Sequence, residues 1–159
     1  MPPEGLRFHI RSSIEQGHAS RIGHGVSVMH EDDATGLLRM MAERGVLVEV
    51  ALSSNDAILG VRGSRHPLRA YLEAGVPVAL VTDDEGISRT TLSREYQRAV
   101  EEHDLDYWTL RRMARASLEH AFAEPPEKER LLAEFDAAMR EFEARWSSGP
   151  GQPTPVSAP

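Results

Sequence analysis

The chain has 159 residues, of which 40% are hydrophobic and 27% charged, values that fit one ordinary globular domain. Its formal net charge of -7 argues against a nucleic-acid partner or an anionic membrane surface, because both require clustered Lys and Arg. The absence of cysteine excludes disulfides, thiolate metal sites and cysteine nucleophiles.

The N-terminus, MPPEGLRFH, lacks the basic start and the apolar core of a signal peptide. No stretch of the sequence approaches the roughly 20 apolar residues that a membrane-spanning helix needs. We therefore expect no membrane partner and, by default, a cytoplasmic location. This default would not apply to a longer protein that carries an export signal.

Extended and helical patterns alternate along the first half of the chain. A short extended run is predicted at 21–24, and an amphipathic helix is predicted at 33–44. Residues 46–52 (VLVEVAL) are rich in β-branched side chains, which predicts a strand bounded by Gly45 and by the polar Ser53, Ser54 and Asn55.

The second half begins with a predicted helix at 67–74 and the most apolar run of the chain, a predicted strand at 76–82. Helices are predicted at 91–102, 106–122 and 126–146. The last of these carries an apolar stripe at spacings of four, four, three and four, formed by Leu131, Phe135, Met139, Phe142 and Trp146. We interpret the stripe as a face docked on its own domain, with a partner-binding face as the alternative. Residues 147–159 contain almost nothing to bury, so they are expected to form a disordered tail.

Strands and helices that alternate at steps of roughly 25 to 30 residues predict βαβ units with a parallel sheet. Three strands are far too few for an eight-stranded barrel, which takes about 250 residues. The pattern is therefore typical of part of a larger α/β fold.

Polar residues follow each predicted strand: His24 between Gly23 and Gly25, then Asn55, and then the pair Asp83 and Asp84. The carboxyl ends of parallel strands meet at one side of a sheet, where α/β proteins place their ligands. We therefore predict that His24, Asn55 and Asp83 converge on one mouth, which favours a metal-assisted hydrolase.

Two interpretations of these side chains stay open on the residues alone. Asp83 could bind a metal cation, which would offset the cost of a carboxylate in an apolar setting, and Asp84 could accept a hydrogen bond from substrate. Alternatively, one or both could cap the helix that follows, a role that Asp often takes. His24 could likewise orient a metal-bound hydroxide or have a structural role.

Three segments in order resemble the C-terminal part of the adenosine deaminase family, in particular its bacterial, growth-factor-like branch. They are 21–25 (RIGHG), 52–55 (LSSN) followed by 66–68 (HPL), and 75–88 (GVPVALVTDDEGIS). The similarity runs from about residue 5 to residue 135. It implies an α/β fold that is the C-terminal part of a (β/α)8 TIM barrel, with about three βα units (strands six to eight) and C-terminal helices over 1–146.

The resemblance also implies residue roles. The family consists of zinc-dependent enzymes that hydrolyse adenosine or a related aminopurine to inosine and ammonia. Asp83 resembles the family's zinc ligand after the eighth strand, Asp84 the neighbouring aspartate that hydrogen-bonds the purine ring, and His24 the histidine that polarises the attacking water.

Two motifs of the family are missing from this sequence. Neither the H-x-H pair that supplies two zinc ligands nor the H-A-G-E stretch that supplies a further histidine ligand and the general acid/base occurs. His9 is not expected to be a ligand, because no Ala-Gly-Glu follows it. We therefore expect the other zinc ligands on N-terminal strands absent from this chain, and no deaminase activity from the chain alone.

The sequence leaves several functional alternatives. The chain could be a truncated deaminase or a half-enzyme completed by a partner that carries an N-terminal half-barrel. It could instead be a non-catalytic purine-binding or scaffold module, or an independent small α/β domain whose aspartates only cap a helix. Unpaired sheet edges are expected to favour self-association.

Overall fold

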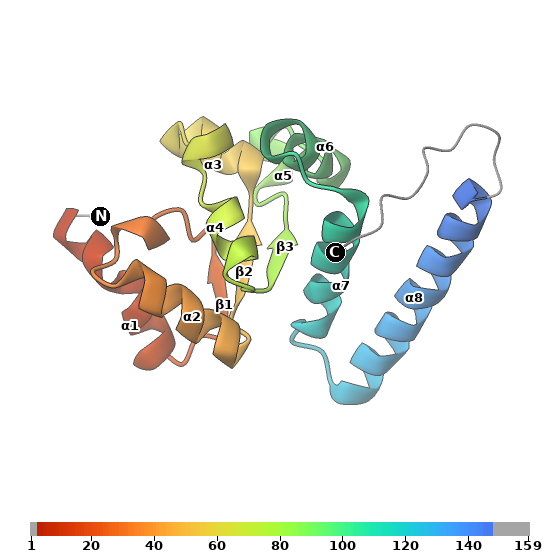
Figure 1. Ribbon diagram of the computed structural model, residues 1–159, viewed down its shortest axis with the longest axis horizontal. Helices are drawn as coiled ribbons and strands as arrows, with labels where there is room; N and C mark the ends of the chain where they lie inside the picture. The colour runs from red at the N-terminus through yellow and green to blue at the C-terminus, as the bar shows by residue number, and fades with distance from the viewer. Residues whose placement is uncertain (1–2, 148–159) are drawn as a thin grey trace. The chain divides into compact units, whose positions relative to one another are not determined.

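The computed structural model describes residues 3–147 of the chain (Figure 1). Its sheet has three parallel strands in the order β1 (Arg21–Gly23), β2 (Leu47–Val50) and β3 (Val78–Leu80). Ile22 pairs with Val48, and Val48 pairs with Val78. The predicted parallel α/β arrangement is confirmed, although each strand is shorter than its apolar run.

The segments before β3 are largely helical. Helix α1 spans His9–Glu15, α2 Ala34–Arg44, α3 Leu52–Leu59 and α4 Leu68–Glu73, with short 3-10 turns at Pro3–Arg7, Val28–His30 and Gly63–Arg65. Asp33 caps α2 by accepting a hydrogen bond from the Gly36 amide, and Gly45 ends that helix in the left-handed conformation. The predicted helices at 33–44 and 67–74 are confirmed.

The sequence did not predict helix α3. Ser53, Ser54 and Asn55, which we expected to bound the strand at 46–52, lie in the first turns of this helix. Ser54 and Asn55 are buried there, so their polarity serves contacts inside the protein rather than exposure to water.

Four helices follow β3: α5 (Glu85–Ser88), α6 (Leu92–His103), α7 (Tyr107–Glu119) and α8 (Pro125–Ser147). Thr91 caps α6 and Asp106 caps α7 through their side chains. The three longer helices confirm the predictions at 91–102, 106–122 and 126–146. Within residues 3–147, none of the helices combines the length and apolar character needed to cross a membrane.

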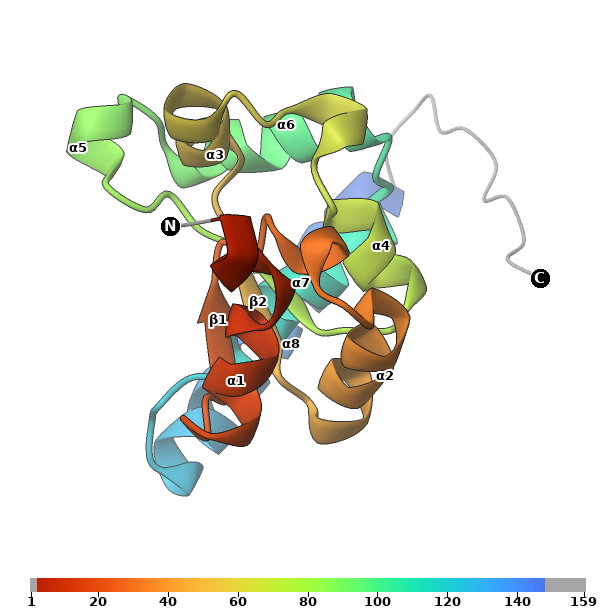
Figure 2. The same cartoon turned by 90° about the vertical axis from the view of Figure 1, so that its left-hand side faces the viewer.

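The sheet is covered on both faces (Figures 1 and 2). Helices α1, α2 and α4 lie on one side, where Ile22, Val48 and Val78 share a core with side chains such as Met41 and Tyr71. Helix α7 lies on the other side, where Ala116 packs with Leu47 and Ala79. Helix α3 stands at the carboxyl ends of the strands, together with α5 and α6.

The chain forms two compact units, Met1–His120 and Ala121–Pro159. The second contains α8, so the docking of the α8 stripe stays a prediction, as does the domain boundary at residue 146. Ser147, which we placed in the C-terminal tail, is the last residue of α8. The rest of the predicted disordered tail lies outside the described residues.

Candidate active site at the carboxyl ends of the strands

The predicted convergence of polar side chains is confirmed. His24, directly after β1, places its Nδ1 2.8 Å from Oδ1 of Asn55 on α3. Its Nε2 lies 3.7 Å from Oδ2 of Asp83, which follows β3. Residues 28 to 59 positions apart in sequence thus form one cluster, because parallel strands bring their carboxyl ends together.

The backbone around this cluster has an unusual conformation. His24 and Asp83 have φ values of 62° and 55°, in the left-handed region that non-glycine residues rarely adopt. Gly25 is also left-handed, and its carbonyl accepts a 2.7 Å hydrogen bond from the buried Tyr71 hydroxyl. Such strained residues persist where surrounding contacts hold them, and they are enriched at functional sites.

The structure distinguishes the two interpretations of Asp83 and Asp84. Asp84 occupies the N-cap position of α5, but its side chain accepts no capping hydrogen bond. Asp83 instead accepts a 2.7 Å hydrogen bond from the Ser54 hydroxyl. Side-chain capping of α5 is therefore wrong for this pair, and the exposed Asp84 carboxylate is available to solvent or to a ligand.

Two residues to which the sequence analysis assigned no role, Ser54 and His66, make hydrogen-bond contacts with members of the cluster. Ser54 holds the Asp83 carboxylate, and the buried His66 places its Nε2 2.8 Å from Nδ2 of Asn55. Burial, together with the neighbouring His103 ring, lowers the pKa of His66 to about 4, so this ring is neutral near pH 7. The sequence signals were modest: a histidine just before a helix, and a serine in the polar segment that follows a predicted strand.

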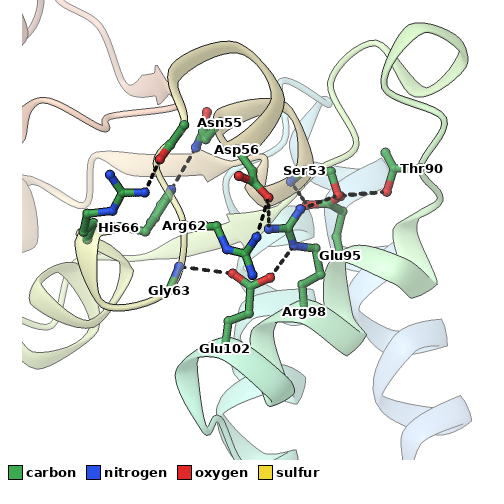
Figure 3. Close-up of polar contacts among 12 residues, drawn as sticks. Ser53, Asn55, Asp56, Arg62, Gly63, His66, Thr90, Glu95, Arg98 and Glu102 are labelled. Atoms are coloured by element: carbon green, nitrogen blue, oxygen red, sulfur yellow. Dashed lines mark hydrogen bonds and ion pairs between the residues drawn. The ribbon is translucent and has the colours of Figure 1, made fainter.

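Helix α3, which carries Ser54 and Asn55, is fixed to α6 by buried polar contacts (Figure 3). The Glu95 carboxylate is fully buried and accepts hydrogen bonds from the Ser53 amide at 3.1 Å and the Thr90 hydroxyl at 2.8 Å. Arg98 bridges Asp56 at 2.8 Å and Glu102 at 2.7 Å. These contacts set where α3 presents its side chains to the mouth.

Two open grooves meet at His24. One, of about 610 Å³, runs beside β1 and is lined by Gly25, Ser54, Asn55 and the exposed Ile58, among others. The other, of about 290 Å³, is lined by Glu49, Thr82 and Asp83. His24 contributes to both walls, so its ring is accessible from either groove.

His9 lies in the first groove with both ring nitrogens engaged. Its Nδ1 is 3.0 Å from the Gly5 carbonyl oxygen, and its Nε2 is 3.0 Å from the Ser27 hydroxyl. A carbonyl oxygen can only accept, so Nδ1 donates and Nε2 is left to accept from Ser27. These contacts give His9 a structural role in joining α1 to the segment after β1.

The metal-binding capacity of these residues is limited. Residues 3–147 hold no group of three His, Asp or Glu side chains that could bind a metal ion. A catalytic zinc takes three protein ligands as well as water, and here Asp83 contributes one carboxylate that already accepts from Ser54. The described part of the chain therefore does not fit zinc by itself.

A parallel sheet with a polar cluster at its strand ends is the arrangement of (β/α)-barrel hydrolases. A family model described as adenosine deaminase matches residues 5–138. The chain belongs to the adenosine deaminase family.

Relatives with different names each match about four fifths of the chain. The adenine deaminase of Sinorhizobium medicae is 37% identical over 127 residues, which cover 79% of this chain and 38% of that protein. The adenosine deaminase of Enterococcus faecalis is 31% identical, with 84% of this chain and 39% of that protein covered. The aminodeoxyfutalosine deaminase of Streptomyces coelicolor is 36% identical, with 80% and 32% covered. The chain thus spans about two fifths of the length of the first of these relatives.

Solved structures show the same fold. An amidohydrolase from Burkholderia ambifaria with bound Zn has a TM-score of 0.79 at 17% identity, covering 94% of this chain and 40% of that one. The adenine deaminase from Arthrobacter aurescens has a TM-score of 0.74 at 23% identity, with 88% and 42% covered. The N6-methyl-AMP deaminase from Arabidopsis thaliana has a TM-score of 0.65 at 32% identity, with 77% and 35% covered. The three strands therefore form part of a deaminase-type barrel.

Proposed function

We propose that this chain supplies one side of the active site of a zinc-dependent purine deaminase. The reaction would replace the exocyclic amino group of adenine, adenosine or a related aminopurine by water, releasing ammonia. The observation that carries this proposal is the convergence of His24, Asn55 and Asp83 at the strand ends of a chain from this family.

Each site residue has a role that its position supports. Asp83, held by Ser54 at the end of β3, would be a metal ligand. Asp84, exposed beside it and not used as a cap, would accept a hydrogen bond from the purine ring. His24, open to both grooves, would orient the attacking water.

A bound zinc ion would lower the pKa of water towards about 7 and so supply hydroxide at neutral pH. The remaining metal ligands and the general acid have to come from residues outside this sequence. We propose that they lie on an N-terminal half-barrel that pairs with the β1 side of the sheet, either in the same polypeptide or in a partner.

The isolated 159-residue chain is expected to lack deaminase activity, because one carboxylate cannot hold zinc at useful affinity. The measurement is hypoxanthine or inosine formation from adenine or adenosine with added zinc. Turnover that is abolished by Asp83→Ala would overturn this expectation.

A graft tests the proposed roles in a complete barrel. Residues 5–138 would replace the matching segment of the Sinorhizobium medicae adenine deaminase, and deamination of adenine and adenosine would be followed. We expect activity in the graft and a loss of at least about a hundredfold for Asp83→Ala and His24→Ala, in line with removal of a metal ligand or a positioned catalytic group. Arg7→Ala, on the exposed surface, serves as the control.

A folded, zinc-loaded graft whose activity is unchanged by both substitutions would contradict these roles. Purine binding by the isolated chain without turnover, measured by equilibrium dialysis with adenosine, would favour the non-catalytic binding module instead.

A further inference from the structure

A buried row of polar groups connects the first turn of α4 to His24. The backbone N–H of Leu68 lies 3.1 Å from Nδ1 of His66, and Nε2 of His66 lies 2.8 Å from the Asn55 amide. The other end of that amide is 2.8 Å from Nδ1 of His24. Asn55 and His66 are 1% and 4% exposed, so the contacts among Leu68, His66 and Asn55 are closed to water, whereas the contact between Asn55 and His24 is partly buried.

The direction of this row is set at its buried end. A backbone N–H can only donate, so Nδ1 of His66 must accept from Leu68. A ring whose Nδ1 accepts is neutral and carries its single proton on Nε2. The pKa of His66, lowered by burial to about 4, agrees with a neutral ring near pH 7.

The proton on His66 determines which end of the Asn55 amide faces it. An amide nitrogen facing Nε2–H would bring two donors together at 2.8 Å in a buried place. A half-turn of the amide exchanges its oxygen and nitrogen with little change in the heavy-atom distances. The oxygen then accepts from His66, and the nitrogen donates to Nδ1 of His24, so each contact of the row joins a donor to an acceptor.

We propose that Asn55 and His66 are positioning residues that hold His24 in the tautomer with its proton on Nε2, the nitrogen directed towards Asp83. We call the row of contacts from Leu68 through His66 and Asn55 to His24 the relay. Its role in deamination rests on the proposed function, whereas the tautomer of His24 does not. In this state His24 presents a hydrogen-bond donor to an oxygen in the mouth. It therefore orients a water or hydroxide through Nε2–H and does not bind a metal through that nitrogen.

The geometry at the mouth agrees with a donor in this position. Nε2 of His24 is 3.7 Å from Oδ2 of Asp83, a carboxylate oxygen that can only accept when ionised. The left-handed backbone of both residues and the Tyr71 clamp on Gly25 keep the ring at this place. The relay adds the one property that backbone position cannot fix, namely which ring nitrogen carries the proton.

The experiment is a long-range 1H–15N correlation spectrum of the 15N-labelled 159-residue chain, at a pH where the histidines are neutral. We expect Nε2–H for His24 and His66. His9 is an internal reference with the opposite tautomer, because its Nδ1 donates to the Gly5 carbonyl. A His24 ring with its proton on Nδ1 would overturn the proposal, and no variant is needed for that result.

Two substitutions test the relay further. Asn55→Asp places acceptors at both ends, so His24 should switch to Nδ1–H while His66 keeps Nε2–H. Ser54→Ala removes the neighbouring hydrogen bond to Asp83 but lies outside the relay, so both rings should keep Nε2–H. An unchanged His24 tautomer in a folded Asn55→Asp protein would also overturn the proposal.

The spectrum is read without substrate, metal or turnover, so its outcome is independent of deaminase activity. An inactive graft together with Nε2–H on His24 would overturn the proposed function and support the relay. In an active graft, the relay predicts that Asn55→Asp lowers kcat far more than it raises KM, because the substitution leaves the Asp84 contact with the purine in place.

Discussion

The loop that carries His24 depends on a single close approach. A Cβ atom added to Gly25 would lie 2.4 Å from the Tyr71 hydroxyl oxygen, far inside van der Waals contact. Tyr71 is fully buried and its hydroxyl donates to the Gly25 carbonyl, so the ring has no room to move away. Gly25 is therefore required both for its left-handed φ of 61° and for the space beside it.

A pair of glycine substitutions separates these two requirements. Gly60 has nearly the same φ, 63°, but nothing lies within 4 Å of the Cβ atom it would gain. Gly60→Ala should lower the free energy of unfolding by about 1–2 kcal/mol, the cost of a left-handed non-glycine residue. Gly25→Ala should lower it by clearly more, because the clash with Tyr71 is added. Urea unfolding measures both, and equal losses would contradict the steric argument.

His66 makes stability depend on pH. Its folded-state pKa of about 4 lies below the ordinary value of 6.5, chiefly because burial disfavours the charged ring; His103, Arg98 and His24 add to the lowering, and Glu102 opposes it. The native state thus binds fewer protons than the unfolded chain between these two values. The His66 contribution is complete above pH 6.5 and is lost as the pH falls towards 4, by up to about 1.4 kcal/mol per pH unit.

The expected result is that the free energy of unfolding of the wild-type chain falls more steeply than that of His66→Gln between roughly pH 6.5 and pH 4. Burial also lowers the pKa of His103. Because both proteins retain His103, the difference between their two slopes reports His66 alone. Urea titrations at several pH values supply both slopes, and parallel slopes would show that His66 is not the titrating group.

At the residue scale, the sequence predicted that His24, Asn55 and Asp83 would converge, since each follows a parallel strand. It did not reveal the contacts that position them. His66 is 11 residues from Asn55 and lies beyond the end of α3 at Leu59, so only the fold of the segment between them brings the two side chains together. The hydrogen bond that Asp83 accepts from Ser54, in place of a capping bond, is likewise a tertiary contact.

At the element scale, α3 holds two of the site's side chains and is secured by α6 (Figure 3). The carboxylate of Glu95 lies against the first turn of α3, where it accepts from the Ser53 amide and where the positive end of the helix dipole favours a negative charge. Arg98 then ties Asp56 of α3 to Glu102 of its own helix. Helix α3 therefore acts as a platform whose position is fixed from outside the mouth.

Removing Arg98 should loosen this platform. Arg98→Met keeps much of the aliphatic length but leaves Asp56 and Glu102, whose side chains are 28% and 20% exposed, without their shared cation. We expect a loss of about 1–3 kcal/mol in the free energy of unfolding, less than for a fully buried pair because water reaches both carboxylates.

Arg7→Met is the matched control, since the Arg7–Asp32 pair has a similar 2.6 Å contact but both side chains are more than 60% exposed. That substitution should cost about 0–1 kcal/mol. Equal losses in urea unfolding would mean that the Arg98 bridge does not stabilise the platform.

The prediction of helices and strands succeeded where a single period of apolar residues dominated the sequence, and it failed at α3. The periodic patterns of α2, α6, α7 and α8 and the β-branched run of β2 were recognisable from sequence. Helix α3 was missed because Ser53, Ser54 and Asn55 have turn-forming side chains, which here contact Thr90, Asp83 and His66 instead. The available signal was Gly60, which ends this helix in the left-handed conformation.

At the scale of the whole molecule, no further strand within residues 3–147 joins the sheet on the outer side of β1, beside the first groove. The strand order β1-β2-β3 places β1 at the edge. The bonds from the His24 amide to Glu49 and from the Leu47 amide to Ser20 show which residues face β2. Because the direction alternates along a strand, the N–H group of Gly23 points away from the sheet. Edges of this kind pair readily with another strand.

The isolated chain is therefore expected to self-associate in a concentration-dependent way, which sedimentation velocity measures directly. Gly23→Pro removes one outward N–H group and should shift the population towards monomer, because proline cannot donate to a new strand pair. Gly23→Ala keeps that N–H group and gains a Cβ atom with nothing within 4 Å, so it should associate as the wild type does.

Pairing through this edge would also occupy the groove beside β1, so adding the N-terminal half-barrel of a relative should compete with self-association. A wild-type chain that stays monomeric at every concentration, or association unaffected by Gly23→Pro, would show that the β1 edge is not the interface.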